Sequence, residues 1–329
     1  MNVTLEKRPS ASLPHRDKSK YRTSSAGWGD RLFQNLTLLF ALSILAIAMA
    51  IAWQLWKNSA LSRHAFGWTF LTKQIWDPVA ENFGALPFVY GTLVSSAIAL
   101  LIAVPLGVGV AIFLSELAPR KISDACSFLI ELLAAIPSVV YGLIGIFVLV
   151  PIMRVHIQPF LMKTLGFLPL FKGPAYGVSM LTAGIVLAIM IVPFITTISR
   201  EIFMSVPAPL KEAAMALGAT HWEVVRLAVL PYAQSGIAGS VFLALGRALG
   251  ETMAVTMVIG NRPEVAASLL APGYTMAAVL ANEFTEATSN LYVHTLVQIG
   301  LVLFAITILV NAAGRLILYK MTPEGDAHQ

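Results

Sequence analysis

An arginine and a glutamate lie inside one of the most apolar stretches of the chain. Residues 243–260 read LALGRALGETMAVTMVIG, with Arg247 and Glu251 four positions apart. A charged side chain inside a membrane is costly, so it usually faces a bundle interior or a water-filled path. A guanidinium presents a planar fork of donors that matches the oxygens of a phosphate or carboxylate. These residue types therefore indicate either a structural ion pair or a contact for an anion that crosses the membrane.

Two interpretations of the pair stay open on the residues alone. A spacing of four puts Arg247 and Glu251 on one face of a continuous helix, close enough to pair. As an ion pair, they would hold neighbouring helices together. As a pathway site, Arg247 would contact the anion, while Glu251 would hold the guanidinium and keep the resting site from binding too tightly. Both roles are compatible with a gate that opens when the pair separates.

The element that carries this pair must be one of several membrane spans. Of the 329 residues, 57% are hydrophobic and 12% are charged, whereas soluble domains are nearer half apolar and a quarter charged. Apolar runs long enough to cross a bilayer as helices lie at about 33–56, 88–114, 125–150, 176–198, 234–259 and 294–318. The sequence therefore predicts an all-α integral membrane protein with six transmembrane helices and no sizeable soluble domain.

Polar segments divide the chain around these spans. We expect a disordered basic tail at 1–30, a first span and outer loop at 31–87, a core at 88–318 that contains a cytoplasmic loop at 200–231, and a second tail at 319–329. Residues 151–175 contain four prolines and are predicted to form a loop that could include a short surface helix, since proline interrupts helices. Lys and Arg residues are enriched on the side that carries both tails, which predicts that both termini are cytoplasmic.

The cytoplasmic loop has a specific local pattern. Gly218 suits the left-handed end of a first helix, and Thr220 with Glu223 has the spacing of a capping box. We predict two short helices joined by a tight elbow, the second ending near Pro231. On local rules alone, the segment is equally compatible with an ordinary connector.

The same loop resembles the EAA motif of ABC-importer permeases. The residues that carry the resemblance are Glu212, Ala213, Ala214, Gly218, Leu230 and Pro231. In that family the two helices dock into a groove on a cytoplasmic ATPase, so the resemblance implies that this loop receives mechanical work. The chain contains no GxxxxGK[ST] sequence and thus no phosphate cradle of that type. We expect a transport subunit rather than an enzyme, with no cofactor of its own and with ATP and Mg bound by the partner ATPase.

Several stretches together resemble the PstC family of phosphate-importer permeases. They are WDPVAENFGALPFVYGTLVSS at 76–96, IPSVVYG at 136–142, the EAA loop, and GRALGETMAVTMVIGN at 246–261. The resemblance covers about residues 65–318. It implies a type I, MetI-like permease core in the plasma (inner) membrane that imports inorganic phosphate by ATP-driven alternating access.

The resemblance also carries residue roles and partners. It assigns the phosphate pathway to Arg247 and Glu251. It implies a PstA-like sister permease, a PstB-like ATPase dimer and a PstS-like phosphate-binding protein, besides membrane lipid.

One further position could shape the pathway. Pro137 removes a backbone hydrogen bond inside a predicted span, which favours a kink. The freed carbonyls and Ser138 could line a cavity, or the kink could serve packing alone.

Other functions fit the sequence less well. An importer of another oxyanion, such as sulfate or molybdate, is the alternative within the class. A secondary transporter driven by an ion gradient would show internal repeats and no ATPase-docking loop. A membrane enzyme such as an acyltransferase would need a nucleophile–base or metal constellation, but the histidines are scattered without HExxH spacing. We therefore predict no metal site, and the lack of a basic patch interleaved with aromatics predicts no nucleic-acid partner.

Overall fold

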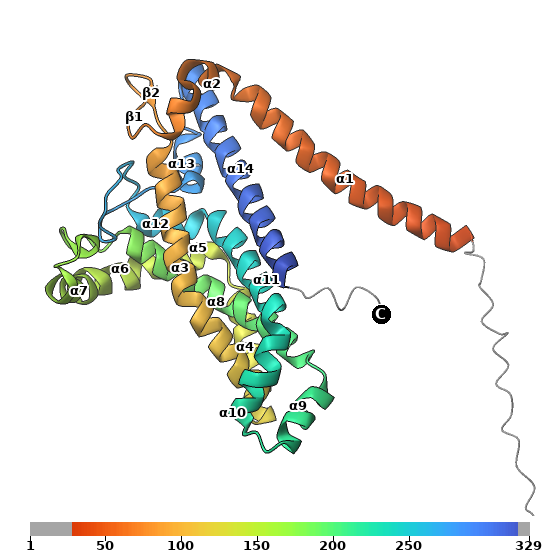
Figure 1. The fold of residues 1–329 in the computed structure, drawn as a ribbon. Coiled ribbons are helices and arrows are strands. Elements are labelled where there is room, and N and C mark those ends of the chain that lie inside the picture. Colours follow the sequence, from red (N-terminus) through yellow and green to blue (C-terminus); the bar gives the residue numbers. More distant parts are fainter. Residues whose placement is uncertain (1–27, 322–329) are drawn as a thin grey trace, which may run out of the picture. The chain divides into compact units, whose positions relative to one another are not determined.

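The computed structural model describes residues 28–321, which are mostly helical (Figure 1). The predicted tail at 319–329 lies largely outside the described residues, as does the predicted tail at 1–30 up to residue 27. The first helix begins at Trp28, inside the segment expected to be a tail. The described residues divide into two units between Ile51 and Ala52.

The helices and strands of the described residues fall into three groups along the chain. The first group is α1 (Trp28–Asn58), α2 (Ala60–Phe66), a 3-10 turn (Gly67–Leu71), β1 (Trp76–Asp77), β2 (Asn82–Phe83), α3 (Leu86–Ile112) and a π-helical turn (Phe113–Leu117). The second group is α4 (Arg120–Ala134), α5 (Ser138–Ile144), α6 (Val150–Ile152) and α7 (Gln158–Leu165), with π-helical turns at Gly145–Leu149 and Met153–Ile157 and a 3-10 turn at Pro169–Phe171. The third group is α8 (Met180–Met204), α9 (Ala208–Ala216), α10 (His221–Val224), a π-helical turn (Val225–Val229), α11 (Leu230–Leu249), α12 (Met253–Ile259), α13 (Met276–Glu283) and α14 (Asn290–Met321).

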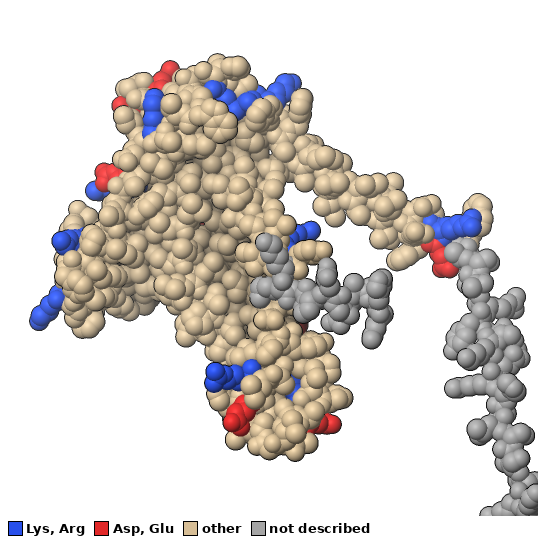
Figure 2. Space-filling view, viewed as in Figure 1, with Lys and Arg blue, Asp and Glu red and all other residues tan. Residues whose placement is uncertain are grey.

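Six helical stretches of the described chain are long and apolar enough to cross a membrane, as predicted. They cover Trp28–Asn58, Leu86–Leu117, Ser138–Leu165, Met180–Met204, His221–Leu249 and Asn290–Tyr319. Charged side chains gather near the ends of elements, while the flank of α3 shows none on the face in Figure 2. This distribution suits a bundle whose middle is surrounded by lipid, because charge is costly at that depth.

The core of the bundle is built around α8. Most of the α8 span is buried, and its side chains pack with those of α3, α5 and α12 in one apolar cluster. Gly142 on α5 lets α12 approach closely, since a Cβ there would lie 2.6 Å from the sulfur of Met257 and 3.1 Å from the Cα of Ala254. Small residues at helix contacts in membranes permit this kind of close packing. The fold thus fixes α12, which directly follows Arg247 and Glu251.

The predicted third span, at 125–150, is wrong in its position. Residues up to Ala134 belong to α4, and the chain breaks at Pro137 before α5 begins at Ser138. Pro137 therefore ends one helix and precedes the next instead of kinking a single span. Its extended backbone, with φ −59° and ψ 140°, is incompatible with a continuing helix.

The predicted loop at 151–175 is also largely wrong, because the helix continues to Leu165. Pro151 and Pro159 each follow a π-helical turn, as Pro231 does further along the chain. A proline has no N–H to donate and its ring crowds the carbonyl four residues earlier. A wider turn just before each proline relieves both problems, so these helices bend without ending.

Candidate functional site

Arg247 and Glu251 lie on either side of a helix break. The predicted span at 234–259 is not continuous: α11 ends at Leu249, and α12 begins at Met253 after Gly250 has taken the C-cap position. Arg247 is exposed in the last turn of α11, where a cation interacts favourably with the helix dipole. Glu251 is half-buried in the break itself, and its Oε1 accepts a 3.2 Å hydrogen bond from the amide of Ala254.

The expected side-by-side placement of the pair on one helix face is therefore not realised. Within residues 28–321 the ion pair that meets a 4.0 Å criterion is Lys211–Glu116, and Arg247 has no hydrogen-bonded or ion-paired partner. Instead of pairing with Arg247, Glu251 stabilises the start of α12 by accepting from a backbone amide that the helix leaves unbonded. The guanidinium is thus left available to a ligand or to another subunit.

The second helix break of the bundle lies near the same arginine. Tyr141 in α5 is close enough to Arg247 for an electrostatic interaction. Its hydroxyl donates a 2.7 Å hydrogen bond to the carbonyl oxygen of Leu133, which ties α5 to α4 across the break at Pro137. Ser138 is half-buried in the first turn of α5, and its proposed role in lining a cavity stays a prediction.

A groove borders the α11–α12 break. It has a volume of about 560 Å³, and Gly250 and Thr252 line it together with side chains from α13 and α14. Its walls are mainly aliphatic, including Leu280 and Leu303. The break is thus open to its surroundings, while the other side of α12 is packed into the core through Ala254 and neighbouring residues.

The loop at 200–231, predicted to be cytoplasmic, forms the predicted pair of helices with an elbow. Gly218 has φ +89°, in the left-handed region, and its amide donates to the carbonyl oxygen of Met215 at 2.9 Å. The amide of Ala219 donates to the carbonyl oxygen of Ala214 at 3.2 Å, which completes a Schellman motif. Thr220 and Glu223 form the predicted capping box in both directions.

The prediction that the second helix ends near Pro231 is wrong. The chain stays helical from His221 through the π-helical turn and along α11 to Leu249. Pro231 lies inside this continuous helix, just after the π-helical turn at Val225–Val229 that accommodates its missing N–H. Consequently the elbow is directly continuous with the helix that carries Arg247 and ends at Leu249.

The remaining residues of the EAA motif take different positions. Glu212 and Ala213 are exposed, while Ala214 and Leu230 pack against a small buried cluster formed by Phe203, Val206, Val229 and others. This cluster joins the loop to the ends of α3, α8 and α11.

An ion pair that the sequence did not predict fastens the first loop helix. Lys211 Nζ lies 2.6 Å from Glu116 Oε1, with side-chain exposures of 22% and 11%. The same ammonium donates to the carbonyl oxygen of Phe203 at 3.4 Å. Glu116 and Lys211 are far apart in the sequence, and no local pattern signals that the ends of α3 and α9 meet. The pair links α9 to the turn that follows α3.

The outer surface of this loop is unusually apolar. Leu217 is 90% exposed and Trp222 is 57% exposed, with Leu210 and Met215 exposed beside them. Large exposed apolar side chains that cluster on a structured element mark a surface that another protein covers. These side chains give the elbow an exposed apolar surface.

Comparison with known proteins identifies the family. The family of binding-protein-dependent transport system inner membrane components matches residues 103–322. The phosphate transport system permease protein PstC of Mesorhizobium japonicum is 49% identical over 296 residues, which cover 89% of this chain and 90% of that protein. PstC of Haemophilus influenzae is 48% identical and covers 89% of this chain and 94% of that protein.

The chain belongs to the PstC permease family. Solved structures show the same fold in more distant transporters. An inward-facing MetNI methionine ABC transporter has a chain that superposes with a TM-score of 0.52 at 18% identity, covering 76% of this chain and all of that one. A bacterial alginate importer gives a TM-score of 0.51 at 16% identity, with 87% of this chain and 99% of that one covered. This PstC-family chain thus has the MetI-like ABC permease fold.

Membership of the family accounts for the general character of the chain. It is a multi-pass protein of the inner membrane and a transport subunit whose family works with ATPases and binding proteins. The individual roles of Arg247, Glu251 and the loop residues rest on the geometry above.

Proposed function

We propose that this chain is the membrane-spanning permease subunit of an ATP-driven importer that carries inorganic phosphate into the cytoplasm by alternating access. The observation that carries the proposal is an exposed guanidinium beside the α11–α12 break, without an ion-pair partner among residues 28–321, in a chain that is 49% identical to a PstC protein. A guanidinium fork fits phosphate oxygens in pairs. Fixed in the membrane, it replaces part of the water that the anion sheds.

In this proposal Arg247 contacts the anion, whereas Glu251 is a positioning residue that acts on the geometry of the helix break. By accepting from the amide of Ala254, Glu251 holds the start of α12 and so the geometry of the break. The negative charge of Glu251 lies across the α11–α12 break from the Arg247 guanidinium. This charge also limits how tightly the resting pathway binds phosphate. A site that bound a divalent anion too strongly would release it slowly.

The cytoplasmic elbow couples the pathway to ATP. The exposed apolar surface around Leu217 and Trp222 is covered by an ATPase subunit, a PstB-like dimer that binds ATP and Mg. The Lys211–Glu116 pair and the continuous rod from His221 to Leu249 then carry its closing movement to Arg247. A PstA-like sister permease completes the pathway, a PstS-like protein delivers phosphate from outside, and both termini of this chain are cytoplasmic.

The test is reconstitution of the complete transporter with its binding protein in proteoliposomes. Phosphate uptake should require ATP on the side of the membrane that carries the ATPase. Sulfate or molybdate at the same concentration as phosphate should compete poorly for uptake. Uptake of sulfate at the rate of phosphate would reassign the substrate. Phosphate uptake driven by an ion gradient without the ATPase would refute the proposal.

A further inference from the structure

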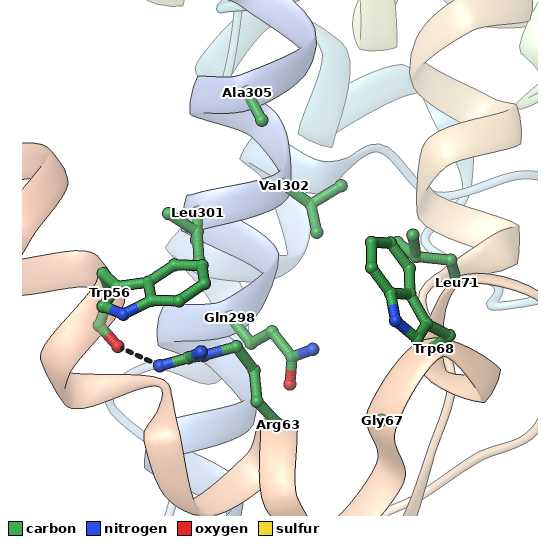
Figure 3. A pocket seen from close by; sticks show the side chains of 9 residues that line it. All are labelled: Trp56, Arg63, Gly67, Trp68, Leu71, Gln298, Leu301, Val302 and Ala305. Carbon is green, nitrogen blue, oxygen red and sulfur yellow. Dashed lines mark hydrogen bonds between the residues drawn. The ribbon is translucent and has the colours of Figure 1, made fainter.

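A second groove lies at the end of the bundle that carries α2. The last turn of α1, α2 with the following 3-10 turn, and the first half of α14 enclose a volume of about 460 Å³, which is in the range of small-molecule sites. Figure 3 shows Trp56 and Arg63 on one side, Trp68 and Leu71 on the other, and α14 side chains between them. The groove is separate from the α11–α12 break, and its lining is mostly apolar.

Arg63 brings an uncompensated positive charge to this groove. Its guanidinium carbon lies 3.7 Å from the centre of a Trp56 ring, Nε donates to Ser59 Oγ at 3.1 Å, and Nη2 donates to the carbonyl oxygen of Trp56 at 2.7 Å. No carboxylate of the described chain lies within ion-pair distance of it. Since a guanidinium has five N–H groups, three remain for an anion, and the stacking on Trp56 holds the cation in place.

Gln298 contributes a buried acceptor atom to which no donor of the described residues is hydrogen-bonded. Its side chain is only 6% exposed, and its Oε1 has no hydrogen-bond partner among residues 28–321. Buried polar atoms are almost always paired, so an unpaired one in a groove points to a ligand that supplies the donor. Figure 3 places the Gln298 amide between Arg63 and Trp68, at the polar end of the groove.

The rest of the groove is an apolar stripe along α14. Leu301, Val302 and Ala305 follow Gln298 on this helix, and seven residues of helix extend about 10 Å. Trp68 at the opposite wall is 87% exposed, as is typical of tryptophans at the headgroup level of a membrane. Along the groove, the Arg63 cation is therefore followed by the Gln298 acceptor and then by the apolar side chains of α14.

We propose that this groove binds one phospholipid whose headgroup carries a hydrogen-bond donor. Its phosphate contacts the free N–H groups of Arg63, its headgroup N–H or O–H donates to Gln298 Oε1, and an acyl chain lies along Leu301, Val302 and Ala305. Free inorganic phosphate does not suit the groove, because the apolar stripe would leave most of it unfilled.

The experiment uses the assembled transporter, purified, delipidated and studied by native mass spectrometry. Phosphatidylethanolamine, with three N–H donors, is titrated against phosphatidylcholine with the same acyl chains, which has none. The wild-type complex should retain one phosphatidylethanolamine and bind phosphatidylcholine about tenfold more weakly, because the buried acceptor stays unpaired. This comparison needs no variant and so does not depend on how any substitution folds.

Variants separate the two polar contacts. Arg63→Gln should weaken the binding of both lipids about tenfold, since it removes the charge-assisted contact to the lipid phosphate. Gln298→Leu should abolish the preference for phosphatidylethanolamine. Lys57→Gln is the matched control, because Lys57 is a neighbouring exposed cation outside the groove lining, and it should bind like wild type. Leu301→Trp should fill the stripe and displace the lipid.

Four results would overturn the proposal. They are no retained phospholipid in the wild-type complex, equal binding of the two headgroups, the same loss with Lys57→Gln as with Arg63→Gln, or full retention in Leu301→Trp. A Leu301→Cys variant adds a direct check on the occupant: efficient cross-linking to a partner subunit would show that protein, and not lipid, fills the groove.

Discussion

Replacing Gly218 by alanine should uncouple the elbow from transport without unfolding the bundle. Gly218 has φ +89°, and a Cβ built on it would meet no atom within 4 Å. The cost of the substitution is therefore backbone strain and not collision. For an L-residue in left-handed geometry this amounts to about 1–2 kcal/mol, which corresponds to a roughly 5–30-fold loss in the population of the native elbow.

The assay is phosphate-stimulated ATP hydrolysis together with phosphate uptake by the reconstituted complex. Gly218→Ala should lower the uptake per ATP hydrolysed and weaken retention of the ATPase in a pull-down, while the melting temperature of the membrane chain stays nearly unchanged. Gly218→Asn is the matched control, because asparagine tolerates the left-handed region better than alanine does. Gly218→Leu should be at least as impaired as alanine. Normal coupling in both the alanine and the leucine variants would refute the reasoning.

Two further predictions concern packing and the loop anchor. Gly142→Ala should lower stability by about 1–3 kcal/mol, since its Cβ would overpack the α5–α12 contact; Gly109→Ala, in a helix with no atom within 4 Å, should be neutral or stabilising in the same thermal-unfolding assay. Equal melting temperatures for the two variants would contradict the close approach. Lys211→Glu should reduce coupled uptake, and the double variant with Glu116→Lys should recover part of it, because their 2.6 Å ion pair fastens α9 to α3. The pair is partly exposed, so a double-mutant cycle should give only about 1 kcal/mol, and a lack of any coupling would remove its proposed role.

The number of spans and the geometry of the elbow were predictable from the sequence because both follow from local rules. Apolar runs of sufficient length form helices in lipid, where the backbone must satisfy its own hydrogen bonds. Gly218 and the Thr220–Glu223 pair lie next to the groups they cap, so their spacing alone specifies the turn. The resemblance to a permease family supplied the docking role, which local rules left undecided.

The positions of helix breaks were not predictable by the same reasoning. Proline was expected to end helices at 151 and 231, yet the chain continues through both after π-helical turns. At Pro137 and Gly250 the helix does end, although an isolated glycine in an apolar run gives only a weak signal. Whether a span bends or breaks depends on its neighbours, such as the packing of α12 against α5.

The interaction partners of the charged side chains could also not be predicted from the sequence. Spacing suggested that Arg247 and Glu251 pair, but the break between them redirects Glu251 to the backbone of α12. Within residues 28–321 the ion pair that does form joins Lys211 on α9 to Glu116 in the turn after α3, two residues far apart in the sequence. Two side chains four positions apart lie on one helix face only where the helix is continuous between them.

The most direct test of the account is phosphate uptake by complexes that carry Arg247→Gln, compared with Arg247→Lys and wild type at equal assembly. The glutamine variant should lose uptake while the complex still assembles, and the lysine variant should retain only part, because an ammonium lacks the planar fork. Exchanging the two charges, as Arg247→Glu with Glu251→Arg, should not restore uptake, since the side chains are not paired. Uptake at the wild-type rate by Arg247→Gln would contradict the central claim that this guanidinium contacts the transported anion.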